Sequence, residues 1–165
     1  MDVSTLERYV RVSLSAQRLE LIERGTVTHE YPVSTALKGA CEQTNSGGTP
    51  RGWLVIRARI GAGQPLGTVF VGRRPTGEYY DESLATQYPE RDWILTRILW
   101  LGGLEPGFNR YGSVDTAKRY IYIHGSPDHG VTGTPASHGC IRMLQHQIIT
   151  LFDRVSVGTR VRVEA

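Results

Sequence analysis

The six residues Ser137–Arg142, with the sequence SHGCIR, hold the group best suited to chemistry in this chain, the thiol of Cys140. Gly139 lets the chain bend tightly just before the cysteine. We expect a short helix to begin just after Cys140, where unpaired N–H groups and the helix dipole favour a thiolate. The backbone N–H groups of Gly139 and Cys140 can also stabilise an oxyanion. Cys140 is therefore the predicted nucleophile.

A nucleophilic cysteine needs a neighbouring base, and His124 and His138 are the near candidates, with His129 a third. His138 lies two residues from Cys140, so the two side chains share a face if the backbone there is extended. His124 must reach Cys140 through the fold, and the carbonyl of Gly125 can fix its tautomer. On these residues alone, His124 and His138 both remain candidates for the base.

Arg142 offers a fork-shaped donor to a substrate carboxylate or a backbone carbonyl, and we predict that Arg142 and Ser137 bind the substrate. Two other interpretations concern the same segment. Cys140 can be a buried structural thiol, or it can bind zinc together with His124, His129 and His138. The 13 residues between His124 and His138 match no compact zinc signature, so we predict no metal and no bound cofactor. Cys41 lies in a polar loop, and we predict no functional role for it.

Composition predicts a single globular domain over residues 1–165, since 39% of the residues are hydrophobic and 21% are charged. The net charge of +3 is scattered along the chain, which argues against a nucleic-acid partner. No segment approaches the roughly 18 apolar residues of a membrane span, and the residues after Met1 show no secretory signal. We therefore expect a cytoplasmic protein with two free thiols.

The apolar pattern predicts a mainly β fold with minor α structure. Period-two alternation and turn residues indicate strands and hairpins in residues 10–33, a long loop over 38–52, and further strands at 53–56, 68–71, 120–123 and 161–163. The strand at 120–123 ends at His124. Residues 93–101 are core, as either helix or strand, and residues 143–155 have roughly helical spacing.

The segment Ile123–Gly125, a loop containing Gly and Pro, and then Ser137–Met143 together resemble the signature of the L,D-transpeptidase catalytic domain, or YkuD, family. Residues 31–35 and 49–52 are similar to further landmarks of that family. The resemblance runs from about Val10 to the C-terminus. It implies a β-sandwich or barrel with a short helix after the catalytic cysteine.

The resemblance implies that Cys140 attacks the bond between the L-centre of meso-diaminopimelate and the terminal D-alanine of a peptidoglycan tetrapeptide. A thioester forms and D-alanine leaves. His124 is then the base, the Gly125 carbonyl orients it, and His138 and Gly139 belong to the pocket. The acyl group passes either to an amine, which makes a crosslink, or to water, which makes a tripeptide.

The family includes cytoplasmic L,D-carboxypeptidases that trim recycled muropeptides, and the expected cytoplasmic location points towards them. An L,D-carboxypeptidase acting on a peptidoglycan tetrapeptide or muropeptide is thus the first expectation, and a crosslinking L,D-transpeptidase is the alternative. A non-catalytic module that binds peptidoglycan peptides is the alternative of another class. We also expect residues 93–115 to shape the substrate entrance.

Overall fold

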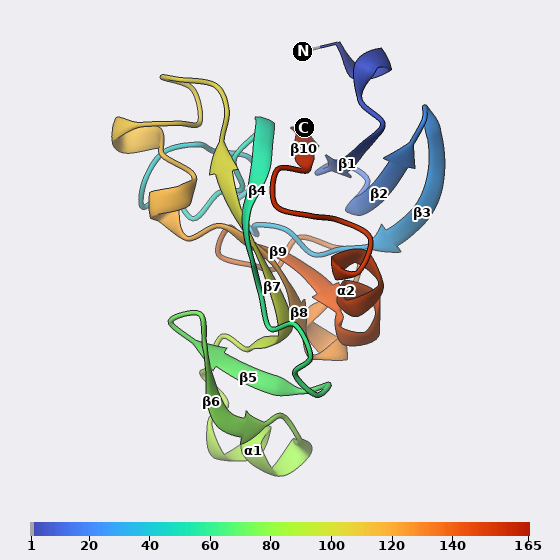
Figure 1. Ribbon diagram of the computed structural model, residues 1–165. Coiled ribbons are helices and arrows are strands. Elements are labelled where there is room, and N and C mark those ends of the chain that lie inside the picture. Colours follow the sequence, from blue (N-terminus) through green and yellow to red (C-terminus); the bar gives the residue numbers. More distant parts are fainter. Residues whose placement is uncertain (1) are drawn as a thin grey trace.

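One curled sheet of ten strands forms the framework of the computed structural model, which describes residues 2–165 (Figure 1). The strands are β1 (Arg8–Ser13), β2 (Arg18–Glu23), β3 (Thr26–Pro32), β4 (Gly52–Ile60), β5 (Thr68–Val71), β6 (Arg74–Tyr79), β7 (Ile94–Gly103), β8 (Tyr122–Ser126), β9 (Ile141–Leu144) and β10 (Arg160–Glu164). The helices are α1 (Glu82–Gln87) and α2 (Gln145–Phe152), with 3-10 turns η1 (Val3–Thr5), η2 (Gly112–Val114), η3 (Ala117–Arg119) and η4 (Asp128–Gly130).

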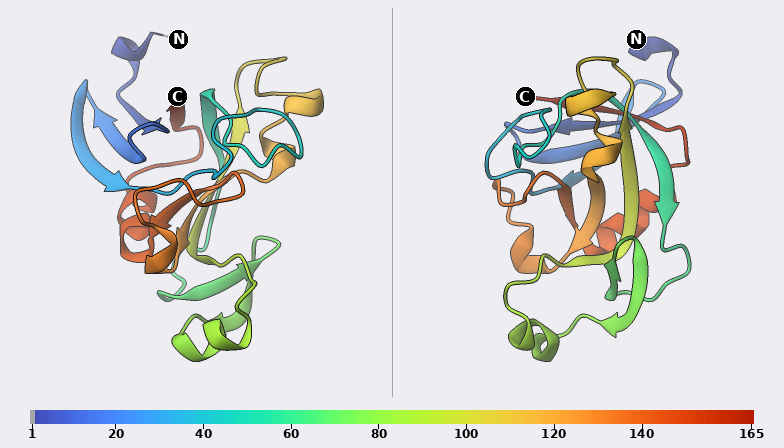
Figure 2. Two further views of the ribbon diagram at one scale, coloured as in Figure 1. Left: turned by 180° about the vertical axis from the view of Figure 1, so that it is seen from behind. Right: turned by 90° about the vertical axis from the view of Figure 1, so that its left-hand side faces the viewer.

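The strands follow the spatial order β3-β2-β1-β10-β4-β7-β5-β6, and β8 pairs with both β7 and β9. The predicted hairpins of the first third are confirmed, because β1, β2 and β3 form an antiparallel meander. Strand β7 is long enough to pair with β4, β5 and β8. Figure 2 shows that the hairpin β5–β6 and α1 lie at one end of the molecule, and the termini lie at the other.

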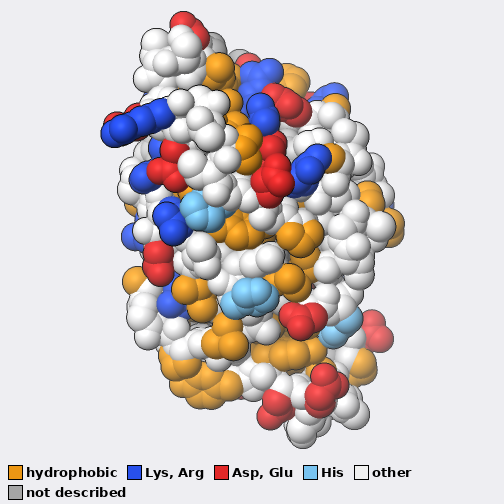
Figure 3. All heavy atoms as spheres, turned by 90° about the vertical axis from the view of Figure 1, so that its right-hand side faces the viewer, with side chains coloured by type: hydrophobic (Ala, Val, Ile, Leu, Met, Phe, Trp, Pro, Cys, Tyr) orange, Lys and Arg blue, Asp and Glu red, His pale blue; other side chains and the backbone are white. Residues whose placement is uncertain are grey.

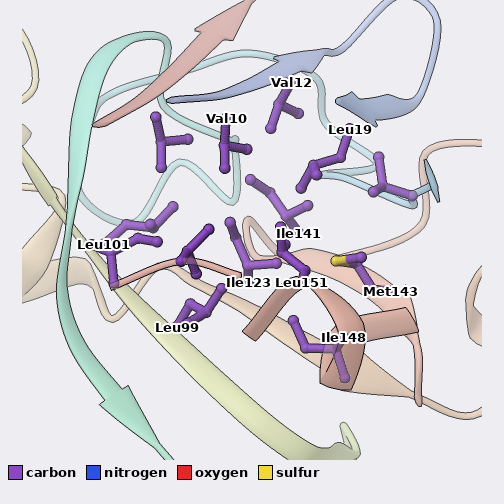
Figure 4. Packing of buried hydrophobic residues seen from close by; sticks show 14 of the residues in the cluster. Val10, Val12, Leu19, Leu99, Leu101, Ile123, Ile141, Met143, Ile148 and Leu151 are labelled. Atoms are coloured by element: carbon purple, nitrogen blue, oxygen red, sulfur yellow. The ribbon is translucent and has the colours of Figure 1, made fainter. Parts of the chain in front are cut away.

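Apolar side chains from both ends of the chain meet in the main core (Figure 4). Strands β9 and β10 bury alternate residues, which is the period of a strand with one face on the core, whereas β8 is buried along its whole length. Helix α2 adds the face formed by Ile148, Leu151 and Phe152. The labelled residues of the cluster are Val10, Val12, Leu19, Leu99, Leu101, Ile123, Ile141, Met143, Ile148 and Leu151.

The surface carries charges of both signs side by side, as Figure 3 shows for one face. This arrangement agrees with the scattered net charge of +3. In the described part of the chain, neither α-helix has the length and hydrophobicity of a membrane span.

Two sequence predictions near the cysteine are wrong. The residues that follow Cys140 form strand β9, and the helix α2 begins only at Gln145. Ile141 and Met143 are buried while Arg142 is half-buried, so pairing with β8 imposes the period of a strand on them. Strand β8 also continues to Ser126, which places His124 inside the strand and not at its end.

Gly125 is the glycine that this packing requires most clearly. A Cβ atom at this position would overlap the carbonyl oxygen of Leu95 in β7, so Gly125→Ala must push the paired strands apart. We expect the variant to lose about 1–3 kcal/mol of unfolding free energy, measured by urea denaturation. Gly102→Ala in β7 is the control, because its Cβ would lie 3.7 Å from the nearest atom, Cδ of Arg57. Equal stability of the two variants would contradict this account.

Candidate active site

The sulfur of Cys140 lies against the start of β8. The N–H of Tyr122 donates to Sγ at 3.3 Å, and the thiol is 3.4 Å from the carbonyl oxygen of Tyr120. Cys140 is half-buried and packs against the apolar cluster of Phe70, Ile98 and Tyr122. The thiol is therefore held between two backbone groups of one segment.

Burial raises the pKa of the Cys140 thiol to about 11, although the N–H of Tyr122 opposes this effect. The predicted stabilisation of a thiolate by a helix is wrong, because a strand follows the cysteine. A sulfur placed among apolar side chains loses the solvation that its charged form needs. In the resting protein Cys140 is consequently a neutral thiol at neutral pH.

His124 is buried, with only 1% of its surface exposed. Its Nδ1 lies 2.7 Å from the carbonyl oxygen of Gly125, which can only accept, so Nδ1 carries the proton and Nε2 is free to take one. Burial lowers the pKa of the imidazole, and the hydrogen bond to Gly125 opposes this shift. His124 is thus neutral, with the tautomer of a base.

The turn before Cys140 is fixed by the hydroxyl of Ser137. This hydroxyl accepts from the N–H of Gly139 at 3.1 Å and donates to the carbonyl of Cys140 at 2.6 Å. Gly139 has a φ of 132°, and a Cβ there would lie 3.1 Å from the carbonyl oxygen of Gly48, so this position needs glycine. The Thr49 hydroxyl binds the Gly139 carbonyl at 2.9 Å. Ser137, predicted to bind substrate, thus supports the turn, and it also lines the cavity that contains Cys140.

His138 and Arg142 both meet Asp92, a residue that the sequence did not single out. Arg142 donates to Asp92 at 3.1 Å, and Nδ1 of His138 lies 3.7 Å from the same carboxylate. The His138 side chain is 83% exposed, whereas that of Arg142 is 15% exposed. Arg142 therefore has a carboxylate partner within the protein, in addition to the substrate carboxylate or backbone carbonyl that the sequence analysis considered.

One cavity of about 480 Å³ is lined by three of the predicted catalytic residues, Cys140, His124 and His138. We call it the cysteine cavity, and its wall includes Cys140, His124, His138, Tyr120, Arg142 and Arg73. A second cavity of about 230 Å³, the side cavity, is lined by Trp93 and His129 and shares Asp92, His138 and Arg142 with the first. The structure thus brings His124, His138 and Cys140 to one cavity and places His129 in the other.

Some of the other residues near the cavity come from segments in which nothing in the sequence indicated a functional site. Arg119 lies in η3 and donates to the carbonyl oxygens of Cys41 and Gly48. It thereby holds the loop over 38–52 beside the cysteine. Of the segment 93–115, Ile94 lines the cysteine cavity and Trp93 the side cavity, while most of the remainder of β7 is buried.

The zinc alternative is not supported by the positions of its ligands. Among residues 2–165, no three histidine, cysteine, aspartate or glutamate side chains converge on a point where they can hold a metal ion. His124, His129, His138 and Cys140 therefore do not form the tetrahedral set considered for the sequence.

The difference in pKa between the two thiols predicts their order of alkylation. With a pKa of about 11, only about a thousandth of Cys140 is thiolate at pH 8, whereas hydrogen bonds from Gln43 and Ser46 lower the pKa of Cys41. We expect iodoacetamide to modify Cys41 first, as followed by peptide mass spectrometry. In Cys41→Ser, labelling of Cys140 should rise about tenfold per pH unit below its pKa. Rapid labelling of Cys140 at pH 6 would contradict the raised pKa.

Comparison with known proteins shows the family of this chain. The model of the L,D-transpeptidase catalytic domain (YkuD) family matches residues 7–163. No curated protein sequence matches the chain significantly. Among solved structures, the L,D-transpeptidase of Xylanimonas cellulosilytica is similar at 19% identity and a TM-score of 0.57, over 99% of this chain and 63% of that one.

Two mycobacterial structures show the same fold. The L,D-transpeptidase of Mycobacterium smegmatis has 18% identity and a TM-score of 0.56, covering 96% of this chain and 59% of that one. L,D-transpeptidase 3 of Mycobacterium tuberculosis, solved with a faropenem-derived adduct, has 14% identity and a TM-score of 0.58, covering 96% and 60%. The chain spans about three fifths of the length of these structures. The match of the family model over almost the whole chain shows that it belongs to the L,D-transpeptidase catalytic domain (YkuD) family.

Proposed function

We propose that the chain cleaves the terminal D-alanine from a peptidoglycan tetrapeptide stem through a thioester on Cys140. The observation that carries this proposal is the presence of Cys140 and a tautomerically fixed His124 on the wall of one cavity. Membership of the L,D-transpeptidase family supports the choice of substrate.

The reaction starts from two neutral groups. As the sulfur of Cys140 attacks the carbonyl carbon at the L-centre of diaminopimelate, Nε2 of His124 accepts the thiol proton. The N–H of Gly139 already binds Ser137, so we assign the N–H of Cys140 to the developing oxyanion. The imidazolium then protonates the leaving nitrogen of D-alanine, and the thioester remains.

The second half of the reaction has two acceptors, water and an amine. Because Cys140 is half-buried and not enclosed, water can reach its thioester, which favours the L,D-carboxypeptidase expected from the sequence. The side cavity meets the cysteine cavity at Asp92, His138 and Arg142 and offers space for a second stem, which favours L,D-transpeptidation. The roles in muropeptide recycling and in the cytoplasm stay predictions.

Substitution of the two candidate bases separates their roles. We expect Cys140→Ala to abolish release of D-alanine and His124→Ala to lower kcat/KM by about 10³-fold or more, since nucleophile and base act as a unit. His138→Ala is the matched control, because its side chain is exposed, and we expect less than about a tenfold loss. A larger loss in His138→Ala than in His124→Ala would reverse the assignment of the base.

The products of the reaction show whether water or an amine accepts the acyl group from the thioester. Tetrapeptide is incubated with the protein, with and without an amine-bearing second stem, and the products are identified by mass spectrometry. Tripeptide alone in both reactions indicates a carboxypeptidase, and crosslinked dimer as the main product indicates a transpeptidase. Binding of tetrapeptide without any turnover would contradict the proposed function and favour the non-catalytic binding module.

A further inference from the structure

The tight turn of the β5–β6 hairpin places an arginine, Arg73, on the wall of the cysteine cavity. Val71 pairs with Arg74, so Gly72 and Arg73 are the two residues of the turn, and both line the cavity. Their φ angles are 55° and 64°, the left-handed conformation of a two-residue hairpin turn. Glycine, asparagine and aspartate are the residues favoured there, and arginine is not. Arg24 has a φ of 50° in the β2–β3 turn as well, so the conformation alone does not mark a function. The place of Arg73 on the wall of the cavity is what indicates one.

The guanidinium of Arg73 is held by aromatic residues next to the nucleophile. It donates to the hydroxyl of Tyr122 at 3.0 Å and lies 4.6 Å from the ring of Trp100 and 5.0 Å from that of Tyr120. The backbone N–H of the same Tyr122 contacts Sγ of Cys140. One tyrosine therefore connects the cation to the reacting sulfur.

Arg73 differs from the other two arginines of the cavity in its partners. Arg142 is paired with Asp92, and Arg119 donates to backbone carbonyl oxygens of the neighbouring loop. Within residues 2–165 the guanidinium of Arg73 makes a single hydrogen bond, to the neutral hydroxyl of Tyr122. An arginine has five N–H donors, so Arg73 keeps donors for an anion from outside the protein.

We infer that Arg73 binds the second carboxylate of meso-diaminopimelate, at its D-centre, in the donor stem. This inference rests on the proposed function. The methylene chain of diaminopimelate can lie on the rings of Tyr120, which is 55% exposed, and Tyr122, both of which line the cavity. A carboxylate at the end of an alkyl chain then meets a guanidinium at the end of an aromatic wall. Arg73 is thus a specificity-determining residue that selects stems with a free carboxylate at this position.

Three tetrapeptides test this assignment: the unmodified stem, the stem amidated at the D-centre of diaminopimelate, and the stem amidated at the terminal D-alanine. For the wild type we expect kcat/KM for the first to exceed that for the second by about 10- to 100-fold, because amidation removes a charge-assisted hydrogen bond to the half-buried guanidinium of Arg73. Arg73→Met should reduce this ratio to about threefold or less. The substitution should lower kcat/KM for the unmodified stem and leave kcat/KM for the D-centre-amidated stem unchanged. Arg73→Lys should retain part of the ratio, since it keeps the charge without the fork.

Arg57→Met is the matched control. Arg57 lies 4.3 Å from the same Trp100 ring, but it is exposed on β4 and does not belong to the described wall of the cysteine cavity. This variant should keep the wild-type ratio.

Each other result contradicts a different statement. Equal kcat/KM of the wild type for unmodified and D-centre-amidated stems, or an equal loss on both in Arg73→Met, would overturn the inference and leave the proposed function intact. A lower kcat/KM of the wild type for the stem amidated at D-alanine only, absent in Arg73→Met, would mean that Arg73 binds the carboxylate of the leaving D-alanine. That result would overturn the assignment. No release of D-alanine from any stem would overturn the proposed function, and the inference with it.

Discussion

Ile123 of β8 lies opposite Ile141 of β9, and this parallel register brings together two segments that are 18 residues apart. Neighbouring strands lie about 4.8 Å apart, so the same register sets Cys140 beside Tyr122 and His124 beside Arg142. A shift of one residue would turn His124 to the opposite face of the sheet. The buried side chains of Ile123, Ile141 and Met143 oppose such a shift, because the strand that moved would turn its own apolar side chains out of their present packing. The core therefore sets the geometry of the reacting groups.

The two members of the ion pair beside the site have opposite effects on the pKa values of the reacting groups. Asp92 raises the pKa values of both His124 and Cys140, and Arg142 lowers both. Since the two contributions oppose each other, burial remains the main cause of both shifts, and it favours the neutral form of each group. The pair instead fixes the wall that the two cavities share, at Asp92, His138 and Arg142.

Local sequence was sufficient for the parts of the site that are contiguous in the chain. Gly139 and Cys140 form a tight turn whose need for glycine can be read from the residue types, and His124 precedes the carbonyl that orients it. Asp92 and Arg73 were missed because they come from the segment before β7 and from a hairpin turn, and only the pairing of β5, β7 and β8 brings them to the cysteine. No local periodicity carries that information.

The error over the residues after Cys140 has a similar origin. A run of four residues, Ile141–Leu144, fits the periods of a strand and of a helix almost equally well. The decision is made by β8, which offers a free edge for parallel pairing, and the helix is delayed to Gln145. The consequence is chemical as well as structural, because a thiol at the start of a strand is without the helix dipole that would lower its pKa.

Burial keeps the resting thiol and imidazole neutral, and a backbone carbonyl in place of a carboxylate does not overcome it. A buried carboxylate beside His124 would stabilise the imidazolium and favour transfer of the thiol proton before substrate binds. The neutral carbonyl of Gly125 fixes the tautomer but supplies no full charge, so proton transfer awaits the oxyanion that attack on the substrate creates. Such a thiol reacts slowly with oxidants, which consume the thiolate form. Because the carbonyl belongs to the strand itself, a conservative replacement of a side chain does not remove it, and the orientation of His124 depends on the pairing of β7, β8 and β9.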